Sequence, residues 1–159
     1  MDDFNKAGEL APYAPGPFAW RGIIYSRQGK QDRALDSVNK ALKLDPIFRL
    51  AVMSLGEINT RLQRYDQAVD AYSKYLAGGP DIHSFSARGF DYLMLGDRAR
   101  AQADFATALK INPNYVQAYI GQGRAFVEGG SFSDGIKSFD AALALQPNNV
   151  EALLRRARQ

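Results

Sequence analysis

The chain has 159 residues, of which 46% are hydrophobic and 23% are charged, a balance typical of a folded globular protein and not of a disordered segment. It contains no cysteine and one histidine, so disulfide frameworks, thiolate metal sites and cysteine nucleophiles are excluded. The net charge of +3 is small and basic residues are scattered among acidic ones, which argues against a dedicated nucleic-acid surface.

Residues 1–14 predict one short helix followed by a corner at Pro12. The start, Met1-Asp2-Asp3-Phe4, is acidic and no long apolar run follows it, unlike a secretory signal. No apolar stretch anywhere in the chain is long enough to span a bilayer. We therefore expect no membrane insertion. The compartment stays open, with the cytoplasm favoured over export.

Residues 15–149 divide into four repeats that are set by proline. Prolines that follow apolar helical runs recur at intervals of 34, 34, 33 and 34 residues, at Pro12, Pro46, Pro80, Pro113 and Pro147. With proline at position 32 of a 34-residue unit, the repeats span 15–48, 49–81, 82–115 and 116–149. Residues 1–14 then correspond to the second helix of a truncated repeat, and residues 150–159 to the first helix of another.

Each repeat predicts a pair of antiparallel helices. Two stretches of about 13 residues carry apolar residues at helical spacing and are separated by a turn near Gly29, Gly96 or Gly129-Gly130. Position 8 is glycine in every repeat, and position 20 is alanine or glycine, which predicts a close approach of the two helices. Large side chains at positions 4, 11 and 24 are expected to fill the space between pairs. Asp81, Asn114 and Asn149 are expected to cap the helices that follow them.

This pattern resembles the tetratricopeptide repeat family. Repeat three matches the family best, through Phe85, Gly89, Tyr92, Gly96, Ala101, Phe105, Ala108 and Pro113. It departs at Arg88, where the family usually has leucine; we expect Arg88 to pack on its own hairpin and to pair with an acid such as Asp104. The resemblance implies an all-α fold, an α-α superhelix formed as a right-handed solenoid of antiparallel helix pairs. It also implies that residues 1–159 are a single array.

Repeat two departs from the other repeats. Asn59 replaces an aromatic residue at position 11, Tyr75 occupies the usually small position 27, and the repeat is one residue short at Gly78-Gly79-Pro80. A local change in the stacking of the helix pairs is expected there. Drift that repacking tolerates is the preferred interpretation over a functional bend.

The resemblance also implies a groove, lined by the first helices, that receives an extended peptide or a helix of another protein. Family positions and the adjacent position 13 place these groove residues: Ile23, Arg27, Met53, Glu57, Arg61, Phe90, Ile120 and Arg124. Methionine, aromatic and arginine side chains are common anchors in protein interfaces. The competing interpretation is that the apolar members pack between neighbouring first helices. The Lys and Asn pair with which chaperone adaptors of this family hold a C-terminal carboxylate is absent.

The sequence predicts a protein-interaction scaffold and no enzyme, cofactor or metal site. His83 has only the sequence neighbours Asp81 and Ser84 as conceivable partners, which is no evidence for a catalytic triad. An alternative is that the array regulates or targets a larger enzyme whose catalytic domain lies outside this chain. RNA binding by helical repeats is disfavoured because the groove centre is apolar. The two part-repeats could also pair end to end between copies of the chain.

Overall fold

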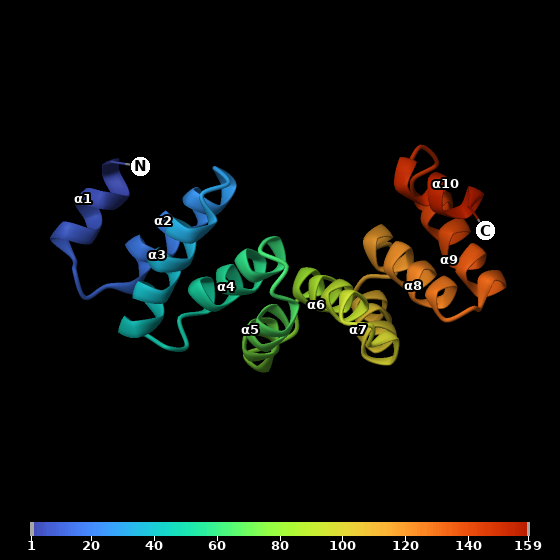
Figure 1. Cartoon of the computed structure of the whole chain (residues 1–159), viewed down its shortest axis with the longest axis horizontal. Coiled ribbons are helices and arrows are strands. Elements are labelled where there is room, and N and C mark those ends of the chain that lie inside the picture. Colours follow the sequence, from blue (N-terminus) through green and yellow to red (C-terminus); the bar gives the residue numbers. More distant parts are fainter. Residues whose placement is uncertain (1, 159) are drawn as a thin grey trace. The chain divides into compact units, whose positions relative to one another are not determined.

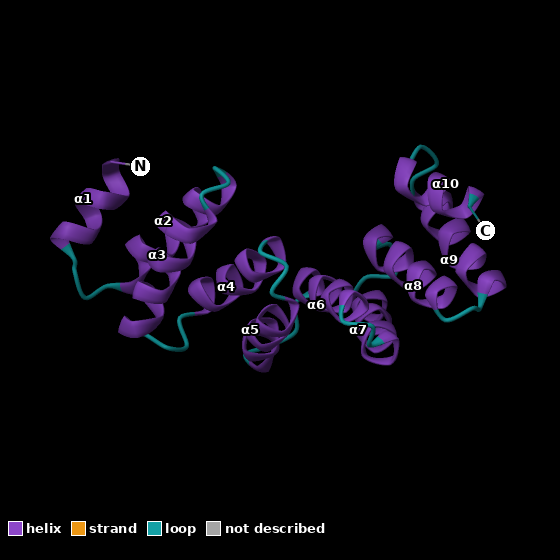
Figure 2. Ribbon diagram, viewed as in Figure 1, coloured by secondary structure: helices purple, strands orange, loops and turns teal. Residues whose placement is uncertain are grey.

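The computed structural model describes residues 2–158, and within this range it contains helices joined by short loops and no strand (Figure 2). The helices, labelled in Figure 1, are α1 (Asp2–Leu10), α2 (Pro15–Arg27), α3 (Gln31–Leu44), α4 (Arg49–Arg61), α5 (Tyr65–Ala77), α6 (Ile82–Met94), α7 (Arg98–Ile111), α8 (Val116–Glu128), α9 (Phe132–Leu145) and α10 (Val150–Ala157). The prediction of an all-α fold is confirmed. Each predicted repeat between residues 15 and 149 contains two of these helices.

Contacts divide the chain into two compact units. Unit 1 is Met1–Gly79 and unit 2 is Pro80–Gln159. In unit 1, α2 pairs with α3 and α4 with α5, and α1 packs on α2. In unit 2, α6 pairs with α7 and α8 with α9, and α10 packs on α9.

The paired helices are antiparallel. In the first pair, Arg21 Nε donates to Ser37 Oγ (3.3 Å) near the middle of the hairpin, and Ser26 Oγ donates to Gln31 Oε1 (3.2 Å) close to the turn. Partners thus draw closer in sequence as the turn is approached, which only an antiparallel hairpin allows. Arg88 and Asp104 form the same cross-hairpin contact in repeat three as Arg21 and Ser37 form in repeat one.

The four turns within the repeats share one backbone geometry. In each, the N–H of position 16 donates to the carbonyl of position 11, at 2.8 to 2.9 Å: Lys30 to Tyr25, Arg64 to Asn59, Asp97 to Tyr92 and Ser131 to Phe126. This bond closes the end of the first helix and requires the left-handed backbone conformation, with positive φ, at position 15. Glycine supplies that residue in three turns, whereas Gln63, with φ of 58°, supplies it in repeat two.

Two of the three predicted helix caps are confirmed and one is wrong. The side chains of Asp81 and Asn149 accept the N–H groups of Ser84 (2.8 Å) and Ala152 (3.0 Å). Asn114 does not cap α8, whose preceding residue is Tyr115 and has no side-chain cap bond. Instead the N–H of Asn114 donates to Asn112 Oδ1 (2.9 Å), so position 31 of the repeat organises this corner as an Asx turn.

The glycine at position 8 accommodates the side chain at position 24 of the same hairpin. A methyl group added to Gly56 would lie 2.8 Å from the Tyr72 ring, and one added to Gly89 would lie 2.8 Å from the Phe105 ring. The predicted approach to position 20 also occurs, since a methyl group on Gly22 would lie 3.2 Å from the Ala34 carbonyl oxygen. The sequence pattern predicted the close approach but not that the side chain at position 24, Val38 in repeat one and an aromatic ring in the other three, is what mainly requires it.

Candidate partner-binding faces of the first helices

The first helices of adjacent repeats lie against each other within each unit, α2 against α4 and α6 against α8. These helices carry all the predicted groove residues. We call Ile23, Arg27, Met53, Glu57 and Arg61 the unit 1 face, and Phe90 with Arg124 the unit 2 face.

The unit 1 face combines apolar and charged side chains. Ile23 of α2 and Met53 of α4 are half-buried, while Arg27, Glu57 and Arg61 are exposed. Both arginines lie in the last turn of their helices, where the helix dipole favours a positive charge. The face therefore offers partly exposed apolar side chains beside two cations and one anion.

Ile120 does not belong to an accessible face. Its side chain is fully buried, at 0% exposure, in the core that α8 forms with α9 and α10 through Val116, Ala142, Leu143 and Ala152. For this residue the competing interpretation, packing between helices, is the one the structure supports. Ile120 is removed from the set of residues that a partner could touch.

The unit 2 face is built around an aromatic ring and an arginine. The half-buried Phe90 ring stands edge-on to the buried Phe105 ring, with centroids 5.0 Å apart. The Arg124 guanidinium lies over the Phe90 ring, 5.6 Å from its centroid, and its Nη2 is 3.6 Å from Glu128 Oε1. Arg124 Nε is buried and has no hydrogen-bond partner. Because a buried N–H without an acceptor costs free energy, this site has an unused donor.

His83 contacts Tyr115 at the start of the first helices of unit 2. Its Nδ1 is 3.1 Å from the Tyr115 hydroxyl, and the two rings are edge-on at 5.5 Å. Burial raises the pKa of the Tyr115 phenol, with the nearby Asp81 carboxylate adding to the shift. The tyrosine therefore stays protonated and holds the exposed histidine in a local polar contact. Among the described residues no three His, Cys, Asp or Glu side chains come together as a metal site would require.

Arg88 pairs with Asp104, as the sequence predicted. Its Nε and Nη2 atoms each donate to one carboxylate oxygen of Asp104 at 2.8 Å, a bidentate pair between α6 and α7. The hydrogen bonds to Asp104 raise the pKa of the Arg88 guanidinium. The pair joins the two helices of a hairpin and is not part of the unit 2 face.

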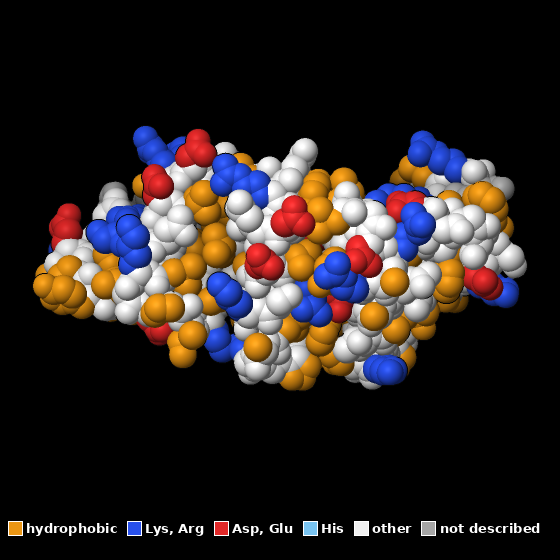
Figure 3. Space-filling view, turned by 60° about the horizontal axis from the view of Figure 1, so that its bottom comes forward, with side chains coloured by type: hydrophobic (Ala, Val, Ile, Leu, Met, Phe, Trp, Pro, Cys, Tyr) orange, Lys and Arg blue, Asp and Glu red, His pale blue; other side chains and the backbone are white. Residues whose placement is uncertain are grey.

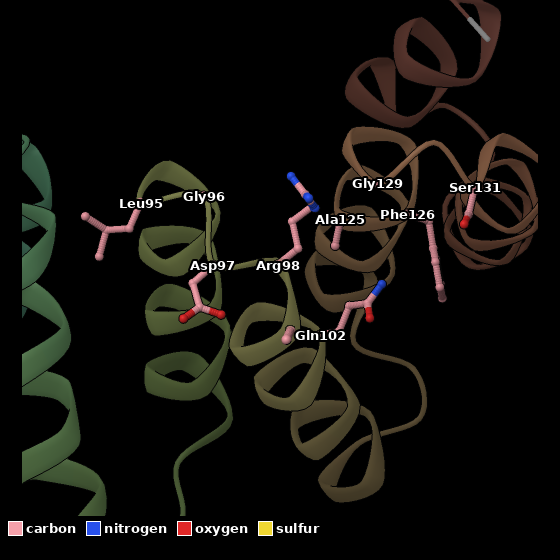
Figure 4. Close-up of a pocket in the computed structure, with 10 residues that line it drawn as sticks. Leu95, Gly96, Asp97, Arg98, Gln102, Ala125, Phe126, Gly129 and Ser131 are labelled. Carbon is pink, nitrogen blue, oxygen red and sulfur yellow. The ribbon is translucent and has the colours of Figure 1, made fainter.

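A separate hollow of about 780 Å³ lies at the turn end of unit 2 (Figure 4). It is bounded by the α6–α7 turn, Gln102, and the end of α8 at Ala125, Phe126 and Gly129. Arg98 reaches from the start of α7 toward that end of α8 (Figure 4). None of the predicted groove residues lines this hollow.

The surface carries charges of both signs. On the face drawn in Figure 3, lysine and arginine side chains alternate with acidic ones and with apolar patches. The expectation that the chain does not bind nucleic acid stays a prediction. In residues 2–158 no helix combines the length and the hydrophobicity that crossing a membrane requires.

Comparison with known proteins agrees with this architecture. The tetratricopeptide repeat profile matches residues 21–81, 87–150 and 120–158. The chain belongs to the tetratricopeptide repeat family. Human tetratricopeptide repeat protein 13 is 28% identical over 137 residues, covering 83% of this chain and 16% of its own length. Human superkiller complex protein 3 is 25% identical over 159 residues, covering 98% of this chain and 10% of its own length. The chain thus spans a small part of these relatives.

Solved structures share the same arrangement of helices. A tetratricopeptide repeat protein from Parabacteroides merdae superposes with a TM-score of 0.87 at 23% identity, over 99% of this chain and 63% of that one. MamA from Desulfovibrio magneticus gives 0.86 at 18% identity, over 92% and 84%. The first repeat domain of Spaghetti (RPAP3), bound to the HSP90 peptide SRMEEVD, gives 0.66 at 27% identity, over 69% and 88%. Proteins of this family generally mediate protein–protein interaction, so the predicted class of scaffold is supported.

Proposed function

We propose that the first-helix faces bind an amphipathic segment of another protein, either an extended peptide or a helix, that presents apolar side chains together with an acidic one. The unit 1 face supplies two arginines against one glutamate around Ile23 and Met53. The unit 2 face supplies Arg124 beside the Phe90 ring. Apolar contact with the half-buried side chains would supply much of the affinity, and the arginines would select the acidic partner.

The unused donor of Arg124 is the observation that carries this proposal. Its Nε is buried without an acceptor, while the guanidinium is held over Phe90 and only loosely paired with Glu128 at 3.6 Å. A partner carboxylate that reaches the edge of the guanidinium would satisfy Nε without breaking a strong existing pair. Such charge-assisted bonds are about twice as strong as neutral ones.

Selection of peptides against the whole chain tests this function. A random library of displayed 12-residue peptides is panned on the wild-type protein, and the enriched peptides are measured by fluorescence anisotropy against wild type, Arg124→Gln and Phe90→Ser. We expect enrichment of acidic residues beside apolar ones, and at least tenfold weaker binding to either variant.

Arg98→Gln is the matched control, because it removes one exposed arginine of unit 2 that lies outside the face. Its affinity should equal that of wild type. Peptides that bind Arg124→Gln and Phe90→Ser as tightly as wild type, with unchanged circular dichroism, would exclude the unit 2 face as the binding site.

The peptide-bound relative is a useful contrast. Spaghetti (RPAP3) was solved with an HSP90 peptide that ends in aspartate. The positions at which chaperone adaptors hold such a carboxyl end with Lys and Asn are Ser86 and Phe90 in repeat three and Ile120 and Arg124 in repeat four. We therefore propose that this chain recognises an internal segment and does not bind SRMEEVD.

Exposed apolar side chains near the two ends support a second proposal, self-association. Leu10 and Tyr13 are 78% and 87% exposed, and Val150 and Leu154 are 66% and 54% exposed. Pairing of α10 of one copy with α1 of another would cover both sets. Sedimentation velocity over a hundredfold concentration range tests this, and a single monomeric species throughout would exclude it.

A further inference from the structure

Repeat two has a cavity beside position 11, the position at which the other three repeats carry an aromatic residue. The cavity has a volume of about 300 Å³ and lies between α3, α4 and α5 of unit 1. Its lining has an apolar and a polar part. The apolar residues are Leu35, Leu42, Pro46, Val52, Leu55 and Ala71, and the polar ones are Asn39, Asn59, Gln67, Asp70 and Lys74. This volume is at the lower end of the range of ligand pockets, about 300 to 1,000 Å³.

The missing ring is that of position 11. In repeat one, Tyr25 occupies this position and the Arg33 guanidinium lies 5.9 Å from its ring centroid. In repeat three, Tyr92 occupies it and Arg100 lies 4.8 Å from the ring centroid. In repeats one and three, the arginine at position 19 therefore packs over the tyrosine ring at position 11 of the same hairpin. In repeat two the two positions hold Asn59 and Gln67, and both line the cavity instead of filling it.

Asn59 is not satisfied by its surroundings. Its side chain is only 2% exposed, and its Oδ1 atom is buried without a hydrogen-bond donor. Buried amide oxygens normally have a partner, and leaving one without a partner costs about 1–3 kcal/mol. Water could satisfy this oxygen, but it would also wet the six apolar side chains of the lining. A ligand with apolar sides and a hydrogen-bond donor at its tip would suit both the Asn59 oxygen and the apolar part of the lining.

We propose that this cavity receives the side chain of a tyrosine from a partner protein. The phenol ring would replace the ring that repeats one and three supply themselves, and its hydroxyl would donate to Asn59 Oδ1. Lys74 and Asp70 of α5 also line the cavity and are exposed, so they can contact the peptide backbone on either side of the tyrosine. This site lies on different side chains from the unit 1 face and does not depend on that face being a binding site.

Two short peptides that differ by one oxygen atom test the proposal. The probes are acetyl-Ser-Ser-Tyr-Ser-Ser-amide and its Phe counterpart, titrated into the whole chain with methyl-labelled Leu and Val. We expect saturable shifts of the Leu35, Leu42, Val52 and Leu55 methyl signals. The Tyr peptide should bind about tenfold tighter than the Phe peptide, as one hydrogen bond to a buried acceptor allows.

Substitutions at Asn59 separate the ring from the hydrogen bond. Asn59→Tyr should fill the cavity, raise the melting temperature and abolish binding of both peptides. Asn59→Leu, which keeps the volume but removes the acceptor, should bind the two peptides equally. Asn114→Leu, the same change at an exposed asparagine of unit 2, is the control and should retain the preference for Tyr.

Several outcomes would overturn the proposal. One is the absence of saturable methyl shifts with the Tyr peptide, and another is equal binding of Tyr and Phe peptides to wild type. Destabilisation by Asn59→Tyr would show that the cavity does not match a ring. Binding of N-acetyl-tyrosine amide without binding of the pentapeptide would make the occupant a small phenol. Concentration-dependent shifts that vanish in Tyr13→Ala would make it a second copy of this chain, whose Tyr13 is 87% exposed.

Discussion

The hairpins of repeats two and three have the same fold with different interiors. In repeat three, α6 and α7 are joined by the Arg88–Asp104 pair, the Tyr92 ring fills position 11, and Gly96 makes the left-handed turn. The Tyr92 ring and Gly96 are what the family pattern and backbone sterics favour, whereas the ion pair is particular to this repeat.

Repeat two replaces each of these features. Leu55 and Ala71 stand where repeat three has its ion pair, Asn59 stands where it has a ring, and Gln63 makes the left-handed turn. What the two hairpins keep in common is the glycine at position 8 against an aromatic ring at position 24. We infer that this contact suffices to define the hairpin, so the other positions are free to vary and to acquire function.

The largest loss of stability is expected at the contact that both hairpins share, the aromatic ring at position 24. Phe105 is fully buried and its ring faces Gly89 of α6 and Gly121 of α8, so it joins three helices of unit 2. Phe105→Ala should lower the free energy of unfolding by about 3–5 kcal/mol, as measured by urea denaturation. Phe132→Ala, at a ring that is 53% exposed, should change it by less than about 0.5 kcal/mol. Equal losses from the two variants would contradict the role assigned to Phe105.

Repeat three has the Arg88–Asp104 ion pair where repeat two has Leu55 and Ala71. Substituting the ion pair by the apolar pair tests how much this difference contributes to stability. Arg88→Leu alone leaves the Asp104 carboxylate, whose side chain is 8% exposed, without its cation. It should therefore cost about 3 kcal/mol of the free energy of unfolding. Arg88→Leu combined with Asp104→Ala should cost less than the single substitution, because no buried charge remains. A double variant that loses the sum of the two single losses would show that the pair is not coupled.

The turn of repeat two should become more stable with glycine, the residue that the other three turns have at this position. Gln63 has φ of 58°, a conformation that costs a side chain about 1–2 kcal/mol and costs glycine little. Gln63→Gly should raise the free energy of unfolding by about 1 kcal/mol, and Gly96→Gln should lower it by a similar amount. Thermal and urea unfolding of the two variants measure this. No gain from Gln63→Gly would mean that the Gln63 side chain makes compensating contacts.

The sequence predicted the hairpins because small and large residues recur at fixed positions, and that recurrence reports packing directly. It did not predict which apolar groove residue is accessible: Phe90 is half-buried and Ile120 is fully buried, although both occupy family groove positions. Accessibility depends on the neighbouring helices, here α9 and α10 for Ile120. The sequence marks Asn59 as a departure from the repeat pattern, but a cavity arises only if no other side chain moves into the space. A single position in a pattern does not carry that information.

The smallest expected effect concerns how the second helix begins in each hairpin. Asp97 caps α7: its Oδ1 accepts the Arg100 N–H at 3.0 Å and its Oδ2 pairs with the Arg100 side chain. Arg64, which precedes α5, makes no such side-chain cap. These bonds, the backbone one first, hold the pKa of Asp97 below its ordinary value. A carboxyl whose pKa is lowered on folding stabilises the fold above its unfolded pKa and loses that contribution as pH falls through its folded pKa.

Asp97→Asn keeps an acceptor at the cap but removes the charge, so it should be less stable than wild type at pH 7 and should approach wild type below the ordinary aspartate range. Unfolding by urea at a series of pH values measures the difference. If the difference in the free energy of unfolding between wild type and Asp97→Asn stays constant on acidification, the Asp97 charge contributes nothing to the stability of α7. The starts of α5 and α7 would then not differ in this respect.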